Sequence, residues 1–153
     1  MLLPASTSEV SKALRIVSFC QAKFSVRSGG HSPNPGFSSI DNTGILIDLQ
    51  RINQFSISPD KSFVSLGPGL RWGNVYDALD PYGVSVIGGR IPHVGVAGLI
   101  LGGSSLPSRL FCGVLISNLP GGFFHFSGEY GLAADNAKNF EVLNTPTVEL
   151  GNC

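Results

Sequence analysis

Charged side chains are scarce in this sequence. Asp, Glu, Lys and Arg make up 13% of the residues, about half of their usual share. The ten basic and ten acidic side chains cancel to a formal net charge of zero, and they form no basic run. Proteins that bind nucleic acid gather Lys and Arg into patches, so no nucleic-acid partner is predicted.

Cysteine is scarce as well, and its spacing carries no recognisable chemistry. Cys20, Cys112 and Cys153 are an odd number of thiols, without a CxxC pair or the His/Cys spacing of a metal site. We therefore predict neither a disulfide framework nor a metal centre. Cys20 falls within a helical pattern, where we expect it to be a thiol in the core.

No apolar run is long enough to make a convincing membrane span. The most apolar window, residues 94–119, contains Pro107, Arg109 and several glycines, so no membrane partner is predicted. The chain also lacks GxSxG and HExxH, and no GxGxxG opens a helix. These absences leave hydrolase chemistry and a Rossmann dinucleotide site without support.

Glycine, in contrast, is abundant, with 20 residues. The first cluster lies in VRSGGHS, residues 26–32, directly after a predicted buried strand. Adjacent glycines let successive backbone N–H groups point into one concavity that holds an anion. Arg27 would stand at its lip and the imidazole of His31 just beyond it. An ordinary tight turn with a surface histidine explains the same residues.

The second cluster is GGRIPHVGVAG, residues 88–98, which begins where a predicted strand ends. Gly95 and Gly98 would let the backbone approach a flat ligand, and the start of the next helix would offer N–H groups to a phosphate. A glycine-packed turn onto a core helix is the alternative. We expect the two clusters to converge on one groove, and we assign His93 no more than a structural role.

The hydrophobic pattern predicts short helices and strands in alternation, typical of an α/β or α+β domain. Helices are expected over residues 7–22 and 72–79. Short strands are expected over 24–27, 45–49, 84–87 and 139–142, and a hairpin within 53–67. The loop at 32–36 is rich in turn residues.

Three runs together resemble a known family. They are RSGGHSPNPGFSSIDNTGILIDLQRIN, GPGLRWGNVYDAL and GGRIPHVGVAGLILGG, and they are similar to the flavin-binding domain of the vanillyl-alcohol oxidase and p-cresol methylhydroxylase superfamily. Within it, the fungal berberine bridge enzyme-like FAD-linked oxidoreductases are most similar. The resemblance implies an α+β fold: a small parallel sheet with helices, plus part of a second mixed α+β subdomain, over residues 1–143.

The resemblance also implies FAD as the cofactor, attached covalently to His31 through the flavin 8α-methyl group. Ile91 stands where some relatives have a cysteine that makes a second link, so a single attachment is expected. Residues 126–136 resemble the segment under the flavin, and 139–142 a strand at the adenine end. A local turn is the alternative for Asp135. The predicted cofactor-binding residues are Arg27, Ser28, Gly29, Gly30, His31, Ser32, Gly88, Gly89, Arg90, Val94, Gly95, Gly98, Tyr130, Asp135 and Val142.

By the same resemblance, the flavin would take hydride or hydrogen from a small organic substrate and be reoxidised by oxygen, while the protein orients it. Two segments depart from the family. Residues 104–120 have no family counterpart and resemble a retained intron or misplaced exon edge, or else a genuine loop. Residues 144–153 are a divergent tail.

Because the family's substrate domain and tyrosine base are missing, no catalytic residue is assigned. We expect this chain to be inactive by itself and to hold FAD weakly. A non-catalytic FAD-binding remnant or a mispredicted gene fragment is the alternative to an oxidoreductase, and a binding module unrelated to flavin is a third. Relatives are often secreted, and no signal peptide is recognised, so we expect an incomplete N-terminus. No localisation is predicted.

Overall fold

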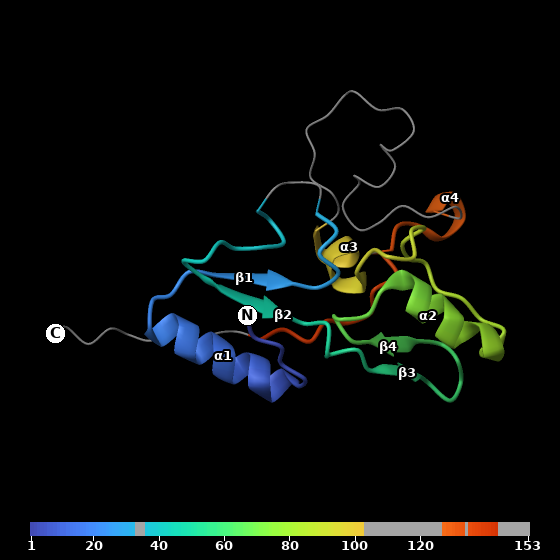
Figure 1. The fold of residues 1–153 in the computed structure, drawn as a ribbon. Helices are drawn as coiled ribbons and strands as arrows, with labels where there is room; N and C mark the ends of the chain where they lie inside the picture. The colour runs from blue at the N-terminus through green and yellow to red at the C-terminus, as the bar shows by residue number, and fades with distance from the viewer. Residues whose placement is uncertain (33–35, 103–126, 134, 144–153) are drawn as a thin grey trace, which may run out of the picture.

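The computed structural model describes residues 1–32, 36–102, 127–133 and 135–143. Figure 1 shows a parallel strand pair with one helix beneath it, beside a hairpin covered by a second helix. The elements in chain order are α1 (Thr7–Phe19), β1 (Phe24–Arg27), β2 (Ile45–Asp48), β3 (Phe55–Ile57), β4 (Val64–Leu66), α2 (Trp72–Leu79), the 3-10 helix η1 (Asp80–Tyr82), α3 (Val96–Gly102) and α4 (Ser127–Tyr130).

Helix α1 begins where its capping residues predict. The Ser6 hydroxyl accepts a hydrogen bond from the backbone N–H of Glu9, a typical N-cap arrangement. The buried face repeats at helical spacing through Val10, Ala13 and Val17. The helix ends at Phe19, three residues before its predicted end. Cys20 is its C-cap and is exposed, so the prediction of a core thiol was wrong.

Strands β1 and β2 pair in parallel, with Phe24 opposite Ile45 and Arg27 opposite Asp48. The prediction for 45–49 is confirmed, since Ile47 is fully buried. The strand at 24–27 exists, but its predicted burial was wrong: Phe24 is 46% exposed. Among the described residues β1 pairs with β2 alone, so one edge of this strand is left uncovered.

The hairpin and helix α2 form a second unit and confirm two further predictions. β3 and β4 pair antiparallel, and α2 covers residues 72–79 as expected. The core lies between α2, the hairpin and the start of α3. Its buried members are Leu70, Trp72, Val75, Leu79 and Val96.

Two predicted strands are absent. Residues 84–87 have no strand partner in the described ranges; Val84 and Val86 are half-buried and pack against the core. Their apolar pattern therefore reflects packing against side chains. Residues 139–142 are also not a strand, and Val142 is 71% exposed. No helix among the described residues is long and apolar enough to cross a membrane.

Candidate functional site

The two glycine clusters meet at their backbones. A β-carbon on Gly29 would lie 2.4 Å from the nitrogen of Gly95, and one on Gly95 would lie 2.4 Å from the nitrogen of Gly29. Such distances exclude any side chain at either position. The second loop is held there by an antiparallel bridge between Arg71 and Gly95 and by a 2.9 Å hydrogen bond from Val96 N–H to the Leu70 carbonyl. The two clusters therefore meet at their backbones as predicted, whereas the cavity beside them is lined by described residues of the first cluster and by none of residues 88–98.

An ion pair between the last residues of β1 and β2 stabilises the turn after β1. Arg27 donates through Nε and Nη2 to Oδ2 of Asp48, at 2.8 and 2.6 Å. The Asp48 side chain is only 5% exposed. Its other oxygen accepts the backbone N–H of Gln50 at 3.0 Å. The guanidinium of Arg27 is therefore engaged with the strand pair and is not free at the lip of the turn.

Gly30 adopts the left-handed conformation, with φ of 67°. The side chain of Arg27 lies beside it: a β-carbon on Gly30 would come within 3.1 Å of the Arg27 Cδ. The Ser28 hydroxyl donates to the carbonyl of Pro68 and joins this turn to the loop before α2. The sequence of two glycines, with the second at positive φ, is compatible with a backbone anion nest.

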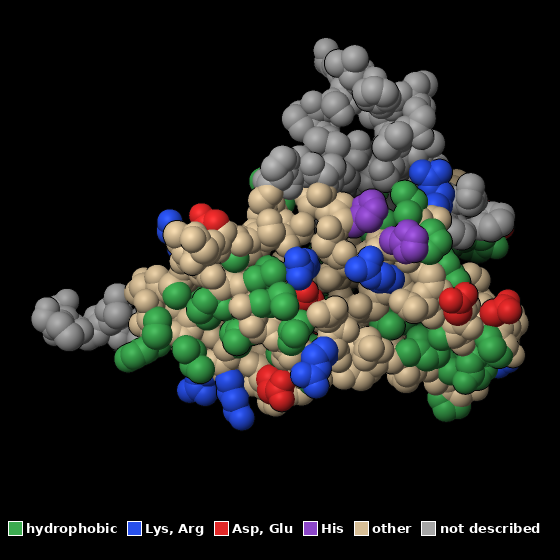
Figure 2. All heavy atoms as spheres, in the orientation of Figure 1, with side chains coloured by type: hydrophobic (Ala, Val, Ile, Leu, Met, Phe, Trp, Pro, Cys, Tyr) green, Lys and Arg blue, Asp and Glu red, His purple; other side chains and the backbone are tan. Residues whose placement is uncertain are grey.

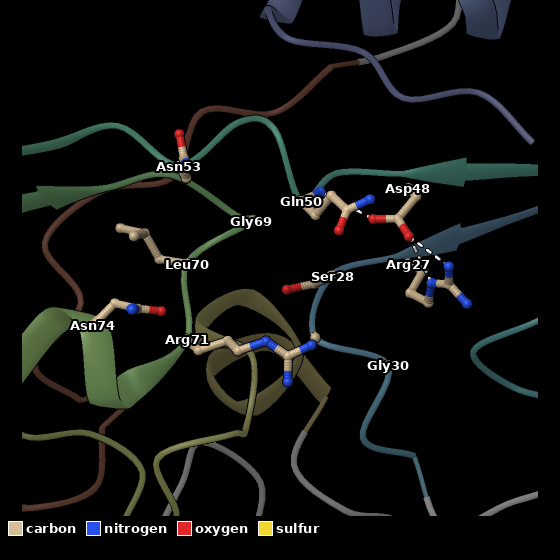
Figure 3. A pocket seen from close by; sticks show the side chains of 11 residues that line it. Arg27, Ser28, Gly30, Asp48, Gln50, Asn53, Gly69, Leu70, Arg71 and Asn74 are labelled. Atoms are coloured by element: carbon tan, nitrogen blue, oxygen red, sulfur yellow. Dashed lines mark hydrogen bonds and ion pairs between the residues drawn. The ribbon is translucent and has the colours of Figure 1, made fainter.

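A cavity of about 520 Å³ opens beside this turn (Figure 3). It lies between the parallel strand pair and the loop that leads into α2, and Leu70 is the one apolar side chain among the described residues that line it. The lining residues are Arg27, Ser28, Gly29, Gly30, Asp48, Gln50, Asn53, Gly69, Leu70, Arg71 and Asn74.

The first half of the second cluster is packed against an indole. A β-carbon on Gly88 would lie 2.1 Å from the ring of Trp72, and one on Gly89 2.4 Å from it. Tyr76 stacks with Trp72 and donates its hydroxyl to the Gly89 carbonyl at 2.9 Å. Burial raises the pKa of Tyr76 to about 12. Both glycines are buried, so here the alternative of a glycine-packed turn describes the structure.

Other predicted residues stand at the surface. His31, Ser32 and Arg90 are exposed, and Val94 is half-buried against the core. Gly98 lies on α3, where a β-carbon would have no neighbour within 4 Å among the described residues. Figure 2 shows histidine side chains together on the face that also carries Lys and Arg side chains.

The C-terminal candidates do not join the two loops. Tyr130 is in α4 and, like Val142, makes no side-chain hydrogen bond to either glycine cluster within the described ranges. Asp135 accepts the backbone N–H of Leu132 at 2.7 Å, as the turn alternative predicts. Residues 33–35, part of the predicted loop, and the segment 104–120 lie outside the described residues.

Three residues that hold the two loops in place were not predicted from the sequence. Asp48 ends β2 as Arg27 ends β1, and parallel strands of equal length bring such ends together, which was a usable signal. Tyr76 lies one helical turn from Trp72, but its bond to Gly89 depends on the tertiary fold. Arg71 had a weaker signal, its position directly before a predicted helix.

Comparison with known proteins identifies this arrangement of glycine loops. A family model described as an FAD binding domain matches residues 1–121. The chain belongs to the FAD-binding domain family. FAD is thus its cofactor, and the earlier resemblance to berberine bridge enzyme-like flavoproteins is confirmed.

The relatives of this FAD-binding domain include fungal enzymes. An FAD-dependent monooxygenase of Arthrobotrys oligospora is 46% identical over 140 residues, which covers 92% of this chain and 24% of the relative. An FAD-dependent monooxygenase of Aspergillus niger is 41% identical and covers 99% of this chain and 23% of the relative. The chain spans about a quarter of the length of the curated relatives it matches.

Solved structures support the same fold. A berberine bridge enzyme variant in complex with (S)-reticuline has a TM-score of 0.69 at 30% identity, covering 87% of this chain and 23% of that one. The 6-hydroxy-D-nicotine oxidase of Arthrobacter nicotinovorans has a TM-score of 0.66 at 28% identity, covering 86% and 24%. The predicted p-cresol methylhydroxylase-type α+β fold is confirmed.

Proposed function

We propose that this chain is the FAD-binding domain of an oxidoreductase that oxidises a small organic substrate, with oxygen as the electron acceptor. The observation that carries the proposal is the contact between Gly29 and Gly95. Two loops that are far apart in sequence meet with bare backbone, beside a polar cavity. Together with the family match, this is the arrangement expected around a cofactor that carries phosphates and a flat ring.

The residues present fit such a cofactor. The turn Ser28–Gly30 offers backbone N–H groups to an anionic group, and positive φ at Gly30 turns the chain as a nest requires. No described atom lies within 4 Å of the position that a β-carbon on Gly98 of α3 would take, and we propose that a planar ring approaches the backbone there. We propose that Arg90, Val94 and Gly95 line the flavin site, with Gly88 and Gly89 supporting them from the core. Tyr130 and Asp135 then belong to the segment under the flavin, and Val142 lies at the adenine end.

His31 is the residue to which we assign covalent attachment. Its side chain is exposed directly after the turn, with Ser32 next to it, whereas Arg27 holds the turn from below. Ile91, where a second attachment would need a nucleophile, has none. Bound FAD supplies the capacity to accept hydride from a substrate. The residues of this chain bind and orient it, and none is assigned as a catalytic acid or base.

We place the domain at residues 1–143, interrupted by an insertion at 104–120 and followed by a divergent tail at 144–153. A second candidate function is FAD binding without catalysis. Substrate-dependent bleaching of bound flavin under anaerobic conditions would exclude this second candidate.

The test uses a version of the chain that lacks residues 104–120 and carries a full-length, family-like C-terminus; it is expressed with FAD present, and flavin absorbance is followed through denaturation. We expect the flavin to stay with this denatured protein and to be found on the peptide that contains His31. His31→Ala should release it. His93→Ala is the matched control, because it removes an exposed imidazole from the second loop and should leave the adduct in place. An adduct that survives His31→Ala would overturn the assignment, and a chain that never binds FAD would overturn the function.

A further inference from the structure

We propose that Arg71 binds a phosphate of the FAD diphosphate from the wall of the cavity opposite the Ser28–Gly30 turn. The inference rests on the proposed function and adds to it a residue that lies outside both glycine clusters. It identifies a side chain that supplies positive charge to a phosphate from the cavity wall, where the Ser28–Gly30 turn offers neutral backbone N–H groups.

The first argument is the charge balance of the cavity. Its charged lining residues are Arg27, Asp48 and Arg71. Arg27 and Asp48 neutralise one another at 2.6 Å, and both carboxylate oxygens of Asp48 accept hydrogen bonds from the protein. No carboxylate within 4.0 Å opposes Arg71 in the described part of the chain. Among the described lining residues, one positive charge is therefore uncompensated, which suits a diphosphate.

The second argument is the way the guanidinium is held. Arg71 is the extended residue at the N-cap of α2, and its backbone bridges to Gly95. Its Nη1 donates to the His93 carbonyl at 2.7 Å. Neither Nε nor Nη2 donates to another described residue. One edge of the planar fork is thus anchored to the second loop, while the other donors remain for a ligand.

The third argument is direction. In Figure 3 the side chain of Arg71 extends from the start of α2 toward the turn that carries Ser28 and Gly30. Both walls line the same cavity. A phosphate between them would accept backbone N–H groups from the turn and charge-assisted hydrogen bonds from the guanidinium, which are stronger than neutral ones.

The experiment compares FAD with riboflavin, which has the same ring but no phosphate. Titrations of flavin fluorescence use the full chain carrying His31→Ala, so that binding is reversible. Arg71→Gln should weaken FAD binding between about tenfold and a hundredfold, the range for a lost hydrogen bond to a charged group. Riboflavin affinity should change less than about twofold, and the decline of FAD affinity with added salt should become shallower.

Two further variants keep the test decisive. Arg15→Gln removes the same charge from an exposed position on α1 and should leave both affinities unchanged. Arg71→Lys retains the charge without the fork, so FAD binding should fall less than in Arg71→Gln; it is the variant to use if the glutamine protein does not fold.

The outcomes separate the two claims. Selective loss of FAD affinity in either Arg71 variant supports the inference. Unchanged FAD affinity, or equal loss for FAD and riboflavin, overturns it and leaves the proposed function standing. If the parent chain binds neither riboflavin nor FAD, the proposed function is overturned, and the role of Arg71 is overturned with it.

Discussion

Replacing Gly29 with alanine should separate the two glycine loops. The new β-carbon would lie 2.4 Å from the nitrogen and 2.6 Å from the α-carbon of Gly95. Carbon atoms in good contact lie about 3.5–4.0 Å apart, so one backbone must move by roughly an ångström. Neither neighbour is a flexible side chain that could rotate away. The clash therefore falls on the position of the loops themselves.

Overpacking of this kind costs about 1–3 kcal/mol of unfolding free energy, which for a chain of this size lowers Tm by roughly 2–12 °C. FAD affinity should fall as well, because the nest is displaced from the second loop. Scanning calorimetry and flavin fluorescence measure the two effects. Gly128→Ala is the matched control for stability, since a β-carbon there meets no described atom within 4 Å on exposed α4. If Gly29→Ala unfolds like this control and binds FAD like the unaltered chain, the argument from the loop contact is wrong.

Two further substitutions test the supports of the loops. Asp48→Asn should lower the unfolding free energy by roughly 1–3 kcal/mol, a range that allows for partial solvent screening of Arg27; urea unfolding that shifts no more than in a surface control would contradict this. Tyr76→Phe should cost about 0.5–1.5 kcal/mol by removing the hydrogen bond to Gly89. Because the pKa of Tyr76 is raised to about 12, its contribution is fully present below pH 10 and declines toward pH 12. In Tyr76→Phe the unfolding free energy should therefore fall less steeply between pH 10 and pH 12 than in the unaltered chain. Identical pH profiles of the unfolding free energy in the two proteins would contradict this.

The sequence by itself determined the local elements and the family. Helix α2 was predictable because Trp72, Val75 and Leu79 repeat at helical spacing before Pro81, and the hairpin because turn residues separate two alternating runs. These patterns arise from contacts within a few residues, which any short window of sequence contains. The glycine clusters were visible in the same way, and the family resemblance through them led to FAD.

The tertiary structure alone decided which of these pieces touch. Residues 84–87 have the apolar pattern of a buried strand. Such a pattern indicates that the side chains are buried, but it does not show whether the backbone pairs with another strand. Here the side chains pack against the core and the backbone has no strand partner among the described residues. The same limit applies to Arg27, whose charge was assigned to a ligand until the parallel register placed Asp48 beside it. Once that pair is neutral, Arg71 is left as the charge facing the cavity. Such assignments depend on long-range neighbours, and these exist only after the chain has folded.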